Sequence, residues 1–576
     1  MTYKEEFNRW LSSALLSDTE REELSAVSGD DIEAESRFYA PLQFGTAGLR
    51  GIMGMGTNRM NRFVVRKTTQ GLAELILREG SAGAERGVVI CYDSRLMSRE
   101  FAFEAACVMA GNGVHIRIFE DMRPTPELSF AVRHWNAMAG INITASHNPK
   151  EYNGYKVYWE DGAQLSAEHA DEVTAVMSRI DVLGGARWME LSEARRVGLI
   201  ETIGRETDEA YLETVLSQAS DRLAVNEAAD SLTIVYTPFH GVGRLLVPEA
   251  LRRLGVRRLV CVEEQMVPDG TFPTLVSPNP ENPEGFELAL RYAEKNKAQL
   301  ILATDPDSDR FAAMVLHKNE YRHLSGNQMG VLMLDYLIGA KRRAGTLPKN
   351  AAVIKSIVTT EMARALAESE GIHIEDTFTG FKYLAEKIRE YETSGSYSVI
   401  FSFEEAIGYL VGDFVRDKDA VTASVIAAEM ASYYHNKKMT MIDALEELYA
   451  KYGYYSEKTV SLVMPGIDGL RKMKALMAGL RAKPPVSLGG MAVTRMLDYL
   501  DGSVKRFDGA REEPSALFGA DVLRFTLEDG DTFIVRPSGT EPKIKVYIMA
   551  RAASESESAQ KAQALSAQAY SLAERL

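Results

Sequence analysis

An apolar run, an amphipathic segment and a second apolar run follow one another between residues 87 and 119, and this order constrains the fold more than any other feature of the chain. Residues 87–92 and 114–119 predict two buried strands, and residues 98–111 predict a helix between them. A helix that connects two strands of one sheet in this way leaves the strands parallel, with loops at the strand ends that can bind ligands. The first part of the chain is therefore predicted to be an α/β domain.

The same alternation returns further along the chain. Strands are predicted at residues 232–236 and 258–262, and a third set of strands and helices follows from about residue 321. From about residue 454 short strands and helices alternate differently. A length of 576 residues suggests about four domains at roughly 150 residues each. The predicted fold class is α/β: three similar α/β domains with mixed, mostly parallel sheets, and a smaller C-terminal α+β lid domain.

A predicted buried strand over residues 139–143 leads directly into the sequence TASHNP, residues 144–149. The Asn-Pro pair ends the regular structure, because the residue before a proline avoids the helical conformation. Ser146 is therefore expected on a loop at the end of a strand, where ligands gather in α/β sheets, with His147 beside it. A polar turn that satisfies its own backbone is the alternative to a catalytic serine.

Asn153 and Gly154 follow this loop, and an Asn-Gly pair is a strong signal for a two-residue hairpin turn. The return strand of that hairpin would carry Lys156 toward the rim on which Ser146 lies. An ordinary surface lysine is the alternative interpretation.

A second buried strand is predicted over residues 300–304 and leads into the sequence DPDSDR, in which Asp305, Asp307 and Asp309 occupy alternate positions. Alternate side chains of an extended chain point the same way, so the three carboxylates are expected to converge. Their repulsion favours a hard divalent cation such as Mg²⁺. An EF-hand is excluded, because Arg310 stands where the calcium loop needs glycine and Leu316 stands where it needs glutamate. A solvated acidic turn is the alternative.

The third motif, RPSGTEPKIKVY, begins at Arg536 after a predicted strand. Arg536, Ser538, Gly539 and Thr540 offer a guanidinium fork, two hydroxyls and backbone N–H groups, which together match the geometry of a phosphate. A plain β-turn would explain the proline and the glycine but has no need of the arginine.

These three motifs, in this order and far apart, resemble those of the α-D-phosphohexomutase superfamily, and the closest similarity is to its phosphoglucomutase and phosphomannomutase branch. Bacterial and eukaryotic members of that branch share the segments FGTAGLRG, YDSR, RPTPELSFAVR and FEEAIGY, all of which occur here. The resemblance extends from about Phe44 to Tyr547 and so covers nearly the whole chain.

The resemblance implies an isomerase that interconverts α-D-glucose 1-phosphate and glucose 6-phosphate through a phosphoserine enzyme and a glucose 1,6-bisphosphate intermediate, with Mg²⁺ as cofactor. The expected domains are residues 1–205, an N-terminal arm with the phosphoserine domain; residues 206–318, the metal-binding domain; residues 319–453, the sugar-binding domain; and residues 454–576, the phosphate-binding lid.

The resemblance also implies which residues act. Those expected in catalysis are Ser146, Lys156, Arg50, Arg310 and His147. Those expected to bind substrate are Thr379, Gly380, Lys382, Glu404, Ala406, Lys418, Arg536, Ser538, Gly539 and Thr540. The expected metal ligands are Ser146, Asp305, Asp307 and Asp309. The family commonly has serine where Ala406 stands, so one contact with a sugar hydroxyl is lost or replaced and the sugar preference stays open.

A formal charge of −15 and the lack of Lys/Arg runs argue against nucleic acid or an anionic membrane as partner, and a phosphosugar would have to be drawn by local basic residues. Three scattered cysteines form no disulfide framework, and no apolar run has the length of a signal peptide core or a membrane span. A cytoplasmic monomer or weak dimer is expected.

Other phosphate and serine enzymes fit the sequence less well. No GxxxxGK[ST] motif for a kinase or ATPase is present, and Ser146 lacks the GxSxG context of a serine hydrolase. Three alternatives stay open: a phosphomannomutase or phosphopentomutase, a glucose-1,6-bisphosphate synthase that uses an outside phosphoryl donor, and a binding protein on an inactive scaffold.

Overall fold

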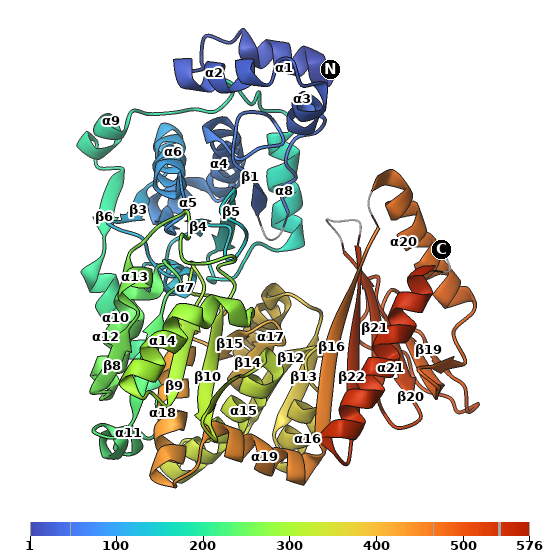
Figure 1. Cartoon of the computed structure of the whole chain (residues 1–576). Helices are drawn as coiled ribbons and strands as arrows, with labels where there is room; N and C mark the ends of the chain where they lie inside the picture. Colours follow the sequence, from blue (N-terminus) through green and yellow to red (C-terminus); the bar gives the residue numbers. More distant parts are fainter. Residues whose placement is uncertain (1, 46–47, 465, 539–542, 575–576) are drawn as a thin grey trace. The chain divides into compact units, whose positions relative to one another are not determined.

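Six strands form the first sheet, in the order β1-β5-β4-β2-β3-β6 (Figure 1). Their bounds are β1 Leu49–Ile52, β2 Val88–Tyr92, β3 Ile116–Phe119, β4 Ala139–Ile143, β5 Tyr152–Trp159 and β6 Ile200–Ile203. β2 is parallel to β3 and β4, and β3 is parallel to β6, whereas β5 is antiparallel to both β4 and β1. The sheet is therefore mixed, with a parallel centre.

The computed structural model describes residues 2–45, 48–464, 466–538 and 543–574. The chain divides into two units, Met1–Ala352 with Gly380–Met441, and Val353–Thr379 with Ile442–Leu576. The first unit contains the first two sheets, and the second contains the C-terminal sheet.

Both faces of the first sheet are covered by helices. Three helices, α4 (Arg62–Arg78), α6 (Ser98–Gly111) and α8 (Ala167–Met177), share a hydrophobic core with Val88 and Ile90 of β2. Helix α7 (Thr125–His134) packs with Val89 and Cys91 on the opposite face. Because successive strand residues point to opposite faces, a strand covered on both sides is apolar throughout, which explains the continuous apolar run in the sequence.

Three short helices precede this sheet: α1 Tyr3–Leu11, α2 Asp18–Ala26 and α3 Asp31–Phe38. Each begins after a polar residue, Thr2, Ser17 or Asp30, whose side chain accepts a hydrogen bond from the first turn. The helices bury Trp10 against Phe38 and Phe63, so this arm has a small aromatic core that continues into α4.

Five strands form the second sheet, in the order β11-β10-β9-β7-β8. Their bounds are β7 Thr233–Thr237, β8 Arg258–Cys261, β9 Leu300–Thr304, β10 Phe311–His317 and β11 Glu320–His323. β7 is parallel to β8 and β9, and β10 is antiparallel to β9 and β11. The helices of this region are α10 Arg205–Ser217, α11 Arg222–Ala228, α12 Gly243–Leu254, α13 Glu263–Met266 and α14 Glu287–Asn296, with a 3₁₀ turn at Pro283–Phe286.

The first unit also holds α5 Gly80–Arg86, α9 Leu191–Arg196, α15 Gly326–Ala344, α17 Phe381–Ser394, β14 Ser398–Glu404, β15 Gly408–Val411 and α18 Ala420–Asn436. β14 and β15 form an antiparallel pair. Helix α18 is buried almost throughout, because α11, α12, α15 and β15 all pack against it.

The second unit is dominated by an antiparallel sheet in the order β16-β22-β21-β20-β18-β17, with β19 paired to β18. Its strands are β16 Tyr454–Val463, β17 Ser487–Leu488, β18 Met491–Asp498, β19 Val504–Arg506, β20 Leu523–Leu527, β21 Thr532–Pro537 and β22 Lys543–Ala552. The helices α20 Gly466–Ala482 and α21 Glu555–Glu574 supply residues to its hydrophobic core. The unit also includes α16 Met362–Ser369, β13 His373–Thr377, most of α19 Met441–Tyr452 and most of β12 Ala351–Ser356.

The hairpin turn predicted at Asn153 and Gly154 is wrong. Both residues lie inside β5 and pair with Gly51 and Arg50 of β1. Gly154 is needed for close approach of two backbones: a Cβ atom there would lie 2.5 Å from Thr144 O and 2.8 Å from Leu49 O. The Asn-Gly pair thus reflects crowding within a sheet, which a turn rule cannot distinguish from a turn.

We expect Gly154→Ala to lower the free energy of unfolding by about 1–3 kcal/mol, because the contacted atoms are backbone and cannot turn aside. Gly29→Ala is the control, since a Cβ at Gly29 meets nothing within 4 Å. Urea unfolding of both variants tests this, and equal midpoints would contradict the crowding described here.

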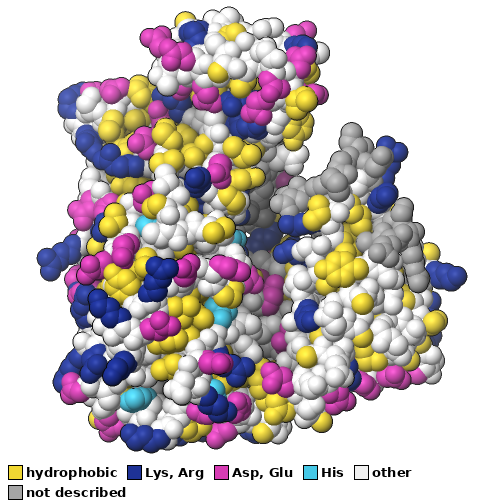
Figure 2. Space-filling view, in the orientation of Figure 1, with side chains coloured by type: hydrophobic (Ala, Val, Ile, Leu, Met, Phe, Trp, Pro, Cys, Tyr) yellow, Lys and Arg dark blue, Asp and Glu magenta, His cyan; other side chains and the backbone are white. Residues whose placement is uncertain are grey.

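Among the described residues, no helix is long and apolar enough to cross a bilayer. Figure 2 shows acidic and basic side chains interspersed on the face in view, without a broad region of one sign.

Candidate active site

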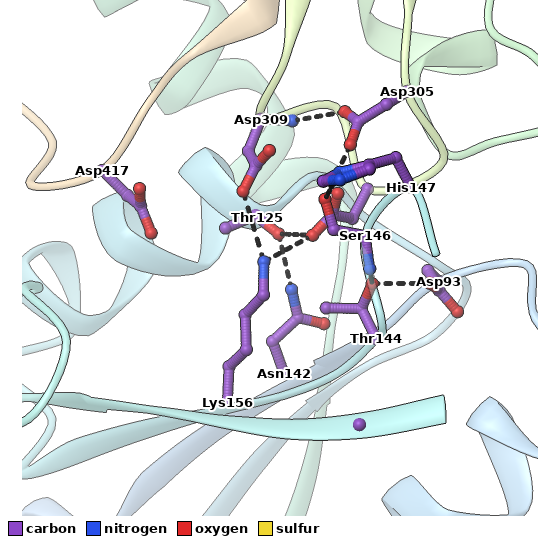
Figure 3. Close-up of polar contacts among 12 residues, drawn as sticks. Asp93, Thr125, Asn142, Thr144, Ser146, His147, Lys156, Asp305, Asp309 and Asp417 are labelled. Carbon is purple, nitrogen blue, oxygen red and sulfur yellow. Dashed lines mark hydrogen bonds and ion pairs between the residues drawn. The ribbon is translucent and has the colours of Figure 1, made fainter. Parts of the chain in front are cut away.

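Ser146 lies on the loop that follows β4, in a left-handed backbone conformation with φ of 52°. The Ser146 N–H donates to Thr144 Oγ1 at 2.8 Å, and Thr144 Oγ1 in turn donates to Asp93 Oδ2 at 2.6 Å. A non-glycine residue with positive φ is strained and needs such support. The Ser146 Oγ atom is thereby held 2.8 Å from Asp305 Oδ2 and 3.1 Å from His147 Nδ1 (Figure 3).

The side chain of Arg95 binds the loop that carries Ser146, residues 144–152, which we call the serine loop. Its guanidinium donates to four backbone carbonyls, those of Ser146 at 2.6 Å, Asn148 at 2.5 Å, Pro149 at 2.9 Å and Tyr152 at 3.0 Å. The Arg95 side chain is fully buried, with Asp93 as its ion-pair partner at 3.4 Å. An irregular loop has no regular backbone hydrogen bonds of its own, and Arg95 supplies hydrogen-bond donors to its carbonyls instead.

The acidic loop follows β9 in the second sheet, and its carboxylates converge through a turn rather than through the extended chain expected from the sequence. Asp305 Oδ1 accepts the backbone N–H groups of Asp309 at 3.1 Å and Arg310 at 2.9 Å, and Ser308 adopts φ of 54°. One oxygen from each of Asp305, Asp307 and Asp309 lies within 4.8 Å of the others. The loop wraps around the first carboxylate and brings the other two beside it.

Two lysines contact this triad, Lys156, which is buried, and Lys418, which is partly buried. Lys156 extends from β5 and donates to Asp307 Oδ2 at 2.7 Å. It also donates to Asp309 Oδ2 at 3.2 Å (Figure 3). Lys418 lies 3.2 Å from Asp309 Oδ2 and 2.7 Å from Asp417 Oδ1. Burial lowers the pKa of both ammonium groups, but the carboxylates around them raise each pKa above its ordinary value. Burial also raises the pKa of Asp309, but the positive charges of Lys156, Lys418 and Arg310 together bring that pKa below its ordinary value.

The triad offers unsatisfied carboxylate oxygens to a cation. Within the described part of the chain, the buried Oδ1 atoms of Asp307 and Asp309 have no hydrogen-bond partner, while the Oδ2 atoms of the same residues are bound by lysine. Unsatisfied buried carboxylate oxygens are costly, and a hard divalent cation would satisfy them with the ligand type it prefers. The residues therefore fit a Mg²⁺ ion.

The other residues expected in catalysis lie around the same loops. Burial, followed by the charges of Arg310 and Arg50, holds the pKa of His147 well below its usual range, so the imidazole is neutral at pH 7. Arg50, on β1, donates to Asn148 Oδ1 at 2.9 Å. Arg310 donates to Ala406 O at 3.3 Å, with its Nε 3.9 Å from Asp309 Oδ1.

Of the residues expected to bind sugar, the first unit contains Gly380, Lys382, Glu404, Ala406 and Lys418, and Lys418 contacts the triad at Asp309. Gly380 N–H donates to Glu404 Oε1 at 2.7 Å, and burial raises the pKa of Glu404. Lys418 passes over Gly408, where a Cβ atom would lie 2.4 Å from Lys418 Cδ. Lys382 Nζ lies 4.5 Å from the centroid of the Tyr383 ring.

The remaining expected substrate residues belong to the second unit. Thr379 is its last residue before the chain returns to the first unit. Arg536 lies near the end of β21 and pairs with Lys545 of β22, and Ser538 N–H donates to Lys543 O at 2.8 Å. Gly539 and Thr540 lie outside the described residues.

Sequence reasoning assigned no role to four residues that support the site. Arg95 and Thr125 lie in the segments YDSR and RPTPELSFAVR, whose resemblance to the family was the available signal. Asn142 lies within β4, and a single polar residue inside an apolar run gives no sequence signal of a role in the site. Asp417 accepts hydrogen bonds from Tyr158 Oη at 2.7 Å and Gln164 Nε2 at 3.0 Å, and so fixes the carboxylate that binds Lys418.

Four descriptions of one family match successive parts of the chain. "Phosphoglucomutase/phosphomannomutase, alpha/beta/alpha domain I" matches residues 41–183, domain II matches residues 209–318, domain III matches residues 325–452, and the C-terminal domain matches residues 493–567. The chain belongs to the phosphoglucomutase/phosphomannomutase family. The expected organisation into three α/β domains and a C-terminal domain is confirmed, while the residues at which we placed the boundaries stay predictions.

Relatives and solved structures agree with this assignment. A protein named phosphoglucomutase from Staphylococcus saprophyticus is 35% identical over 89% of this chain and 91% of its own length, and one from Staphylococcus aureus is 34% identical over 93% and 94%. A putative phosphomannomutase from Thermus thermophilus has a TM-score of 0.69 at 22% identity, covering 93% of this chain and 99% of that one. The phosphoglucomutase parafusin from Paramecium has a TM-score of 0.69 at 17% identity, covering 93% and 95%. The two structures show that the fold is shared.

Proposed function

We propose that this protein is a phosphoglucomutase that interconverts α-D-glucose 1-phosphate and glucose 6-phosphate. The observation that carries the proposal is the distance of 2.8 Å between Ser146 Oγ and Asp305 Oδ2. Asp305 belongs to the buried acidic triad, whose residues fit a divalent cation. Curated relatives of this name, which align over about nine-tenths of the chain, supply the choice of reaction.

In the proposed reaction Ser146 carries a phosphoryl group as a phosphate monoester. The O6 hydroxyl of glucose 1-phosphate attacks this phosphorus, the bond from phosphorus to Ser146 Oγ breaks, and the O6 proton passes to a nearby base. The resulting glucose 1,6-bisphosphate turns over in the site. Ser146 Oγ then attacks the phosphorus on O1, the bond between phosphorus and O1 breaks, and O1 takes up the proton, so glucose 6-phosphate leaves and the phosphoserine is restored with no net change in atoms.

Asp305, Asp307 and Asp309 would hold Mg²⁺, with an oxygen at Ser146 as a further ligand. Bound there, the ion would neutralise negative charge on the phosphoryl group. Arg50 and Arg310 would add positive charge beside the same group, and Lys156 and His147 are the candidates for proton transfer.

Glu404 and Lys418, with Gly380, Lys382 and the backbone at Ala406, are proposed to bind the sugar. Arg536, Ser538, Gly539 and Thr540, with Thr379, are proposed to bind the phosphate that does not react, because a guanidinium and adjacent hydroxyls suit a dianionic phosphate. A cytoplasmic location and a monomeric or weakly dimeric state also stay part of this proposal.

The test is a coupled assay of purified full-length protein with glucose 1-phosphate, a trace of glucose 1,6-bisphosphate and Mg²⁺. We expect glucose 6-phosphate to form, EDTA to abolish its formation and excess Mg²⁺ to restore it. Mannose 1-phosphate and ribose 1-phosphate in the same assay distinguish the related mutases. Turnover of either one in preference to glucose 1-phosphate, or net formation of bisphosphate from an outside donor, would contradict the proposal.

A further inference from the structure

The carboxylate of Asp307 is fixed by the first α/β sheet and its helices rather than by its own loop. Asp307 Oδ2 accepts hydrogen bonds from Thr125 Oγ1 at 2.9 Å and from Lys156 Nζ at 2.7 Å. The backbone N–H of Thr125 also donates to the main-chain oxygen of Asp307 at 2.9 Å. Thr125, the first residue of α7, therefore holds Asp307 at two points.

A second buried residue fixes the direction of the Thr125 hydroxyl. Asn142, the last residue but one of β4, donates from Nδ2 to Thr125 Oγ1 at 2.7 Å (Figure 3). A hydroxyl has one proton to donate, and because Asn142 already donates to its oxygen, the Thr125 proton is directed at Asp307. Asn142, Thr125 and Asp307 are all completely buried, so water does not compete for these bonds.

This chain of hydrogen bonds distinguishes the two oxygens of Asp307. Two donors saturate Oδ2, whereas Oδ1 has no partner in the described part of the chain. Asp305 is held differently, by backbone N–H groups of its own loop, and Asp309 is held by the two lysines. Asp307 is thus the member of the triad whose orientation depends on α7 and β4.

We infer that Thr125 and Asn142 are positioning residues for the cation site: through Asp307 Oδ2 they turn Oδ1 toward the ion, and they do so before the ion binds. The inference rests on the proposed function in one respect, that the triad binds a divalent cation. The hydrogen bonds themselves involve only groups of the chain, so the carboxylate is ordered in the metal-free protein and little reorganisation opposes binding.

The test measures binding of Mn²⁺, a divalent probe that takes oxygen ligands, to the metal-stripped full-length protein from the EPR signal of the free ion. Thr125→Val keeps the shape of the side chain and removes the hydroxyl, and we expect the Kd for Mn²⁺ to rise by about 10–100-fold. Thr125→Ser keeps the hydroxyl and is expected to bind nearly as tightly as the unmodified protein. Thr68→Val is the matched control, because the buried Thr68 hydroxyl donates to Val64 O within its own helix, α4.

Asn142→Leu provides an independent variant if Thr125→Val fails to fold, since it leaves Thr125 and the acidic loop unchanged. We expect a smaller rise in Kd than for Thr125→Val, with the unfolding midpoint in EDTA measured alongside. An unchanged Kd in Thr125→Val or in Asn142→Leu would overturn the inference, as would a Thr125→Ser protein that binds no better than Thr125→Val. If the unmodified protein bound no Mn²⁺, that result would contradict the proposed cation site itself, and it is distinguishable from a failure of the positioning role of Thr125 and Asn142.

Discussion

Replacing Ser146 by alanine is expected to abolish turnover of glucose 1-phosphate, with a loss of at least about 10⁴-fold in kcat, or more than about 5 kcal/mol of transition-state stabilisation. The reason is chemical: the variant retains the triad, Lys156 and Arg310, but it has no oxygen at the position 2.8 Å from Asp305 Oδ2. Removing the atom that forms the covalent intermediate removes the pathway and leaves only binding interactions.

Two measurements check this result. A coupled assay gives the rate, and intact mass shows whether one phosphoryl group is carried by the unmodified protein and missing from the variant. Ser432→Ala is the control, because the buried Ser432 hydroxyl donates to Ala428 O inside α18 and should be dispensable for activity. A Ser146→Ala protein that still carried phosphate, for instance on His147, would contradict the phosphoserine mechanism.

Arg95→Met is expected to have the largest effect on stability, lowering the free energy of unfolding by about 3–5 kcal/mol. Methionine fills most of the volume of the arginine stem but donates no hydrogen bonds. The Asp93 carboxylate would lose its ion-pair partner, and the carbonyls of Ser146, Asn148, Pro149 and Tyr152 would lose their shared donor. The size of the loss follows from the two groups that are fully buried, the Asp93 carboxylate without its counter-charge and the Ser146 carbonyl without its donor.

Urea unfolding measures this difference directly. Arg253→Met is the matched control, because Arg253 makes two ion pairs on the exposed surface, with Glu209 and Glu249, and its loss should cost less than about 1 kcal/mol. If the two variants unfolded at the same urea concentration, Arg95 would not be the residue that holds the serine loop.

Much of the fold could be predicted from local pattern. The strands at residues 139–143 and 300–304 and the helix at residues 98–111 have the predicted bounds, because continuous apolar runs and flanking polar residues mark buried elements clearly. Helical periodicity in the sequence predicts a helix over residues 68–78, whereas α4 begins at Arg62, where Asn61 caps it, and periodicity alone does not contain that capping signal.

The parts of the site that could not be predicted depend on contacts across the sequence. Thr125 and Asp307 are 182 positions apart, and Lys156 and Asp307 are 151 apart, so no local rule connects them. The turn at the acidic loop was missed because aspartates at every second position can converge in two ways. The chain can be extended, or it can wrap around one carboxylate. Gly154 was assigned to a turn because its requirement for glycine comes from the backbone of neighbouring segments, which the local sequence does not show.

The acidic loop and its compensating lysines come from separate segments, and this has a consequence for how the chain folds. The loop after β9 concentrates three carboxylates, whereas Lys156 comes from β5 in the first sheet and Lys418 from the segment before α18. A nascent chain that had formed only the second sheet would carry three repelling charges with Arg310 of the same loop, but without Lys156 and Lys418, to compensate them. Docking of the first sheet relieves that repulsion, so the two regions are expected to reach their native state cooperatively, and neither would retain the site if expressed alone.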